Sequence, residues 1–239
     1  MLRTMVWVLI LALLPLGMMF ITARPVLAVS CPQCFGFTRI ADGVYAESSM
    51  PAADRDHTLK VLAESERRVT AFYGSLEHRP RWLVCGADAC YDRIGGMEGT
   101  GTGSVGDLAI VVASQALDPV LIATSLSHAE LMGRVGMWRM KTGAVPAWFD
   151  AGVAVLAADD PAYLAPASRT RKDRCLTGPG GELPEDPGLW QERVQNFDYL
   201  NAAAACRVDL WMIAHGGSPA VGTLLGKLAE GQSFDALFR

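Results

Sequence analysis

An apolar run near the start of the chain limits what the rest can fold into. The run extends from Met5 to Ile21 and follows Arg3, which is the arrangement of a signal peptide or of an N-terminal membrane anchor. In both cases the remainder of the chain is delivered across a membrane. We therefore interpret residues 1–28 as a leader and residues 29–239 as one domain, exported to the periplasm or the extracellular space.

Two fates of the leader remain open. Val26, Leu27 and Ala28 offer small or β-branched side chains at the positions that a signal peptidase reads, which favours cleavage. The apolar run is also long enough to span a bilayer with a slight tilt, which favours retention. Membrane association through residues 5–22 is therefore one expectation and removal of the leader is the other.

The charge of the chain excludes one class of partner. The formal net charge is -4 at pH 7, and loss of the leader with Arg3 and Arg24 would make it -6. No run of Lys or Arg occurs elsewhere in the chain. Because the phosphates of nucleic acids require a basic face, we expect no nucleic-acid partner.

Six cysteines follow the leader as three local sets. An even number of cysteines behind an export signal favours disulfide bonds. A competing interpretation joins the first four as a zinc knuckle, but it requires reduced thiols in an oxidising compartment. The sets are Cys31 with Cys34, Cys85 with Cys90, and Cys175 with Cys206, and we expect the cysteines to form disulfides. Cys85–Cys90 and Cys175–Cys206 are the expected pairs, while the sequence leaves the full connectivity open.

The hydrophobic pattern predicts an α+β fold, in which a small N-terminal sheet packs on a helical core. Alternating or continuous apolar residues predict short strands, and apolar stripes at a spacing of three to four residues predict helices. Strands are expected at 43–48, 81–85 and 108–112. Helices are expected after Pro51–Asp54 as far as Gly74, at 118–140 with Asp118 as N-cap, at 146–157, at 199–215 and from Ser218.

Two segments are expected to be irregular. The glycine-rich stretch 95–106 leads into a strand, whereas a nucleotide-binding loop leads into a helix, so we interpret this stretch as a mobile connecting loop. Residues 159–195 are rich in Pro, Gly and charge. They predict a long surface excursion that Cys175 tethers.

Two helical segments contain residues of the kinds that bind metals or take part in catalysis. The first contains His128-Ala129-Glu130-Leu131, and the second reads Pro-Ala-Trp-Phe-Asp-x-Gly-x-Ala from Pro146. Together with the helical tail to Phe238, they resemble the core of gluzincin (MA-like) zinc metallopeptidases over about half of the chain. In that family His-Glu-x-x-His on one helix and the glutamate of Trp-x-x-Glu-Gly on the next hold zinc and activate water.

The resemblance implies a site that has lost most of its functional residues. The family's first histidine, its general base and its third ligand fall on Thr124, Ser125 and Ala151. Of the zinc ligands, the histidine at His128 alone is kept. Glu130 and Asp150 are predicted to point away from His128, because of their positions on the two helices.

The resemblance also implies a peptide groove. We expect strand 108–112 with Val111 to form its edge and helices 118–140 and 146–157 to form its floor. His128, Trp148 and Tyr199 are the other candidate groove residues, although ordinary packing is an alternative for Tyr199.

The implied function is that of a pseudopeptidase in the cell envelope, which binds a peptide or protein partner without hydrolysing it. No catalytic set is intact, so we expect no enzyme activity, no bound metal and no cofactor. One alternative is an active zinc metallopeptidase in which His128 acts with ligands from 159–195. Another is a structural envelope protein whose groove is filled by side chains.

Overall fold

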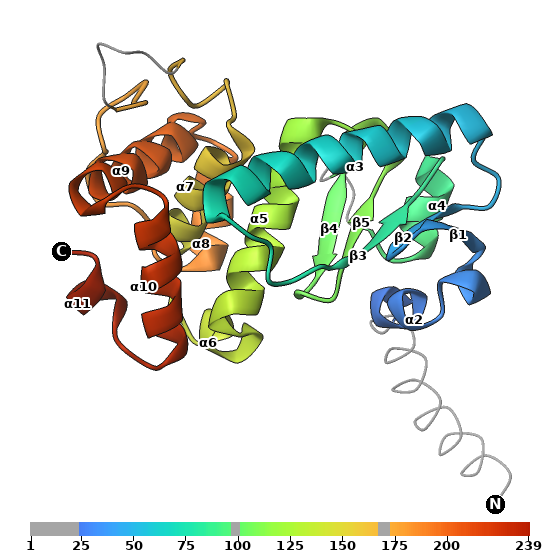
Figure 1. Ribbon diagram of the computed structural model, residues 1–239, viewed down its shortest axis with the longest axis horizontal. Helices are drawn as coiled ribbons and strands as arrows, with labels where there is room; N and C mark the ends of the chain where they lie inside the picture. The colour runs from blue at the N-terminus through green and yellow to red at the C-terminus, as the bar shows by residue number, and fades with distance from the viewer. Residues whose placement is uncertain (1–23, 97–100, 167–172) are drawn as a thin grey trace, which may run out of the picture.

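The computed structural model describes residues 24–96, 101–166 and 173–239, and its fold is α+β (Figure 1). The apolar run, and with it the proposed membrane segment 5–22, lies outside the described residues. In the part that is described, no helix is long and apolar enough to cross a membrane. The folded region begins before residue 29, because Ala28 and Val29 at the end of the first described helix are buried in the core.

The chain alternates strands and helices first and is helical thereafter. The strands are β1 (Phe37–Ala41), β2 (Val44–Glu47), β3 (Arg81–Val84), β4 (Thr102–Val105) and β5 (Ala109–Val112). The described helices that begin before residue 140 are α2 (Arg24–Ser30), η1 (Pro32–Phe35), α3 (Ala52–Tyr73), α4 (Asp88–Arg93), η2 (Ser114–Ala116), α5 (Pro119–Val135) and α6 (Met137–Lys141). The later ones are α7 (Ala147–Ala158), α8 (Pro187–Val194), α9 (Tyr199–His215), α10 (Pro219–Ala229) and α11 (Phe234–Leu237).

The five strands form one mixed sheet in the order β1-β2-β3-β5-β4. β2, β3 and β5 run parallel, while β1 and β4 pair antiparallel at the two edges. All four side chains of β5 are buried, as expected for a strand that is covered on both faces. The strand expected at the groove edge is therefore an interior strand, and the prediction for 108–112 was wrong in this respect.

Two apolar cores lie side by side and share long helices. One core gathers around the sheet, and the other lies between α7, α9 and α10. Figure 1 shows α3 running across both halves and α5 standing between the sheet and the helical half. Side chains of α3 and α5 contribute to the sheet core, while Leu131 and Val135 near the end of α5 join the other. These helices thereby fix α7 relative to the sheet.

Local signals placed several boundaries correctly. Asp118 caps α5, because its carboxylate accepts hydrogen bonds from the amides of Val120 (2.9 Å) and Leu121 (3.0 Å). The helix expected over 118–140 is interrupted, however, at Gly136. Its backbone adopts φ 93°, which a glycine tolerates and a regular helix excludes, so two helices replace one.

The two segments expected to be irregular both contain regular structure. β4 lies within the glycine-rich stretch 95–106, so its described part is not merely a connecting loop; residues 97–100 lie outside the described residues. The excursion 159–195 contains α8, and Leu164 forms an isolated bridge with Cys175. β4 owes its place to pairing with β5, which the local composition did not reveal.

All six cysteines form disulfides within the three sets: Cys31–Cys34, Cys85–Cys90 and Cys175–Cys206. The two pairs predicted from the sequence, Cys85–Cys90 and Cys175–Cys206, are confirmed. Three disulfides indicate an oxidising, exported environment. The third pair connects the excursion to α9 and so holds the segment after α7 against the helical half.

Candidate functional site

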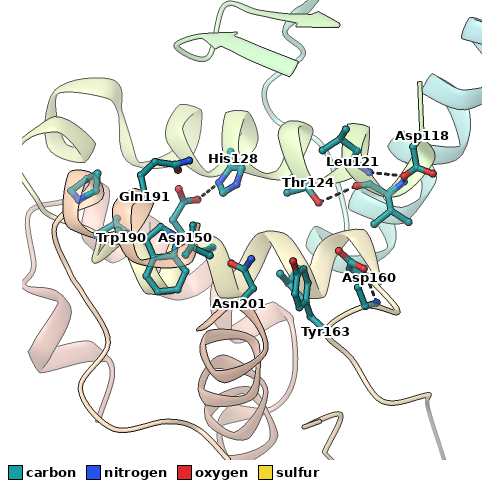
Figure 2. Close-up of a pocket in the computed structure, with 18 of the residues that line it drawn as sticks. Asp118, Leu121, Thr124, His128, Asp150, Asp160, Tyr163, Trp190, Gln191 and Asn201 are labelled. Carbon is teal, nitrogen blue, oxygen red and sulfur yellow. Dashed lines mark hydrogen bonds and ion pairs between the residues drawn. The ribbon is translucent and has the colours of Figure 1, made fainter. Parts of the chain in front are cut away.

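A cavity of about 760 Å³ lies between α5 and α7, with α8 and the segment after α7 completing its wall. Figure 2 shows the two helices crossing the view with their side chains directed into the space between them. Apolar side chains of both helices form part of the lining. Its polar lining includes Asp118, Thr124, His128, Asp150, Asp160 and Asn201.

The close packing of α7 on α9 holds one wall in place. A Cβ atom at Gly152 would lie 2.6 Å from the carbonyl oxygen of Ala204 and 3.0 Å from Cγ2 of Val208. Only a glycine lets the two backbones approach this closely. Close packing therefore explains why position 152 is a glycine, and no catalytic role is needed.

His128 and Asp150 form the central polar contact of the cavity. Nδ1 of His128 lies 2.9 Å from Oδ1 of Asp150, and because a carboxylate accepts only, the imidazole donates (Figure 2). The prediction that Asp150 points away from His128 was therefore wrong. Asp150 precedes the position of the family's third ligand by one residue, and the orientation of α7 turns this residue toward α5.

The pair changes the protonation of the imidazole. Burial opposes the charged form of His128, but the negative charge of Asp150 and the hydrogen bond from Nδ1 favour it more strongly, so the pKa of His128 is raised above its ordinary value. The His128 side chain keeps 37% of its surface exposed, so the ring is accessible from the cavity. The cavity thus holds an imidazolium over a wider pH range than a free histidine would.

Three of the four positions expected to share one cavity do so. Thr124, His128 and Ala151 line it, as the helical spacing of 124 and 128 predicts. Ser125 does not line it, since its hydroxyl donates to Oγ1 of Thr102 in β4 (3.0 Å). Ser125, at the position of the family's general base, thus connects α5 to the sheet.

Glu130 points away from the cavity, as expected, and has a structural role. Its fully buried carboxylate accepts hydrogen bonds from the backbone amides of Glu77 and His78, each at 2.9 Å. Arg134 donates to the same carboxylate over 2.7 Å. These contacts hold the turn after α3 against α5.

The other candidate groove residues lie elsewhere. Val111 is buried in the sheet core, and Trp148 is buried among Phe149, Phe234 and Phe238 at the far side of α7. Tyr199 is 56% exposed, and its ring is packed against Phe197. None of these three lines the cavity, so their placement in a groove wall was wrong. His128 is the one groove residue predicted from the sequence that lies there.

The residues present do not fit a zinc ion. At the family's ligand positions the cavity offers the imidazole of His128, the methyl group of Ala151 and the neutral hydroxyl of Thr124, which donates to the carbonyl of Val120 (3.0 Å). A catalytic zinc needs three protein ligands. Throughout the described ranges, no group of three or more His, Cys, Asp or Glu side chains is placed to hold a metal ion.

Little in the sequence indicated the remaining lining residues. Tyr163 and Asp160 come from the excursion, and Trp190 and Gln191 come from α8 within it. Neither segment carries a periodic pattern that assigns it to a site. Asp118 was recognised as a helix cap, but its position at the cavity depends on how α5 and α7 meet.

No protein-family model, no curated protein and no solved structure matches this chain. The gluzincin resemblance therefore rests on the residues of the chain alone.

Proposed function

We propose that this chain is an exported pseudopeptidase-like domain, whose cavity between α5 and α7 binds part of a peptide or protein partner without hydrolysing it. The observation that carries the proposal is the convergence of Thr124, His128 and Ala151 on one cavity whose donors do not fit zinc. The cavity has the size of a typical ligand pocket and combines apolar walls with a few polar groups. A site of this kind suits a peptide segment.

The His128–Asp150 pair supports binding over zinc hydrolysis. A metal-dependent peptidase needs a base beside the bound water, and the residue at that position, Ser125, is directed to Thr102. Asp150 instead fixes the orientation of the imidazole, which leaves Nε2 as the second polar atom of the ring. The cavity is thereby equipped for hydrogen bonding to a partner.

A peptide pool tests the proposal directly. The protein is incubated with a pool of random acetylated decapeptides, and bound and free peptides are separated and identified by mass spectrometry. We expect peptides to be retained intact, with no cleavage that a chelator abolishes. Thr124→Phe, which adds a ring inside the cavity, should abolish retention. Leu121→Trp, at the exposed edge of the lining, provides a second blocking variant if the first does not fold.

Two outcomes would contradict the proposal. Retention that survives both blocking variants would place the partner elsewhere. Chelator-sensitive cleavage together with about one zinc per chain, lost in His128→Ala, would favour the active metallopeptidase.

Anchoring by the leader is part of the same proposal. α2 begins at Arg24, shortly after the apolar run, and the carbonyl of Val29 accepts a hydrogen bond from Arg81 (2.8 Å), so the folded domain begins within a few residues of that run. Intact-mass spectrometry tests this part of the proposal. A mature protein that begins at Val29 would show that the leader is cleaved and would contradict anchoring.

A further inference from the structure

Apart from His128, the charged side chains that line the cavity are all negative. Asp118, Asp150 and Asp160 contribute carboxylates, and no Lys or Arg is among the described residues that line it. The cavity therefore attracts positive charge and repels negative charge. This preference adds to the apolar contacts that any peptide would make there.

The three carboxylates are not equivalent. Asp150 has a charged partner in His128, which offsets part of its field. Asp118 and Asp160 accept hydrogen bonds from backbone amides only: Asp118 from Val120 and Leu121, and Asp160 from Ala162 (2.9 Å). In the described part of the chain, neither forms an ion pair. Their negative charge is available to a ligand.

The chain direction brings these two residues to the same end of the cavity. α5 begins at Asp118, and α7 ends just before Asp160, because the two helices run in opposite directions (Figure 2). Figure 2 shows the ring of Tyr163 standing beside Asp160 at this end. An aromatic face beside carboxylates favours a cationic group, through its quadrupole as well as through charge.

We propose that the end of the cavity formed by Asp118, Asp160 and Tyr163 binds a cationic nitrogen of the partner, either a Lys or Arg side chain or a free amino terminus. This inference rests on the proposed peptide-binding function and names the chemistry that the site selects. Apolar residues of the partner occupy the remainder of the cavity, along α5 and α7.

Defined peptides measure the selectivity. The probe is an acetylated, amidated heptapeptide of alanine and leucine with one variable central residue, and calorimetry with the full-length protein in mild detergent gives its Kd. We expect lysine and arginine peptides to bind about fivefold to tenfold more tightly than the norleucine peptide, since one charge pair at the surface of a cavity contributes at this scale. A glutamate peptide should bind most weakly. Raising the ionic strength should reduce the preference for lysine.

A separate arm identifies the source of the cation. The norleucine peptide is measured with a free amino terminus and with an acetylated one. Tighter binding of the free form alone assigns the site to a chain terminus, whereas a preference for lysine among acetylated peptides assigns it to a side chain. Either result supports the inference.

Matched variants keep the backbone contacts and remove the charge. Asp118→Asn and Asp160→Asn preserve a side-chain oxygen for the amides that each aspartate accepts from, so folding is retained. Each should reduce the preference for the cationic peptide about threefold, and the double variant should abolish it. Asp54→Asn, in the first turn of α3 at the sheet end of the molecule, changes the net charge equally and should leave the preference unchanged.

The outcomes separate the two proposals. Equal affinity for lysine, norleucine and glutamate peptides would overturn the cationic site and leave peptide binding intact. An equal loss in Asp54→Asn would also overturn it, because the effect would then be one of net charge. Failure of every peptide to bind would contradict the proposed function itself.

Discussion

At the residue scale, the His128–Asp150 contact makes the cavity sensitive to pH. The pKa of His128 is raised because the charge of Asp150 and the hydrogen bond outweigh burial. We expect Asp150→Asn to lower this pKa, since the amide keeps an acceptor oxygen but loses the charge. Titration of the histidine C2 protons by NMR measures it. Asp160→Asn, which alters a carboxylate bonded to Ala162, is the control and should cause a smaller shift.

The same contact predicts a pH dependence of stability. A group whose folded pKa is raised contributes stability in full below the unfolded value, about 6.5 for histidine, and loses it as the pH rises through the folded pKa. The difference in free energy of unfolding between the wild type and Asp150→Asn should therefore be larger at acidic pH than in alkaline solution. A difference that grows with increasing pH would contradict this assignment.

At the element scale, the approach of α7 to α9 depends on Gly152. Gly152→Ala should destabilise the protein by about 1–3 kcal/mol, because its Cβ would meet the backbone of Ala204, which cannot move without displacing α9. Gly226→Ala in α10 is the matched control, since nothing lies within 4 Å of its Cβ. That change should be neutral or stabilise by up to about 1 kcal/mol. Urea denaturation of both variants measures the contrast, and equal effects would show that α7 and α9 pack less closely.

The sequence predicted elements whose signals are local. Asp118 caps α5 because a capping side chain needs only the next few amides, and the helix after Pro146 follows from its apolar residues. Strand order was not predicted, because β4 lies in a glycine-rich stretch and owes its place to pairing with β5. The inward direction of Asp150 depends on the rotation of α7 against α5, which no pattern within either helix determines.

At the scale of the whole molecule, the Cys175–Cys206 disulfide connects the cavity wall to the helical half. It closes a sequence separation of 31 residues, compared with 3 for Cys31–Cys34. Chain entropy predicts a stabilisation of about 3–4 kcal/mol for the long loop and about 2 kcal/mol for the short one. The double variant Cys175→Ala with Cys206→Ala should therefore lose more stability than Cys31→Ala with Cys34→Ala.

The long disulfide should also affect binding. Asp160 and Tyr163 line the cavity and lie shortly before the tethered segment, in which Leu164 pairs with Cys175. Release of Cys175 from α9 loosens this wall, so peptide affinity should fall even under conditions in which the variant remains folded by circular dichroism. The Cys31 and Cys34 variant, altered near α2, should retain the affinity of the wild type. Unchanged peptide binding in the Cys175 and Cys206 variant would show that other contacts, such as the hydrogen bond from the Arg174 amide to Asp209 of α9 (2.6 Å), are enough to hold the segment after α7 in place.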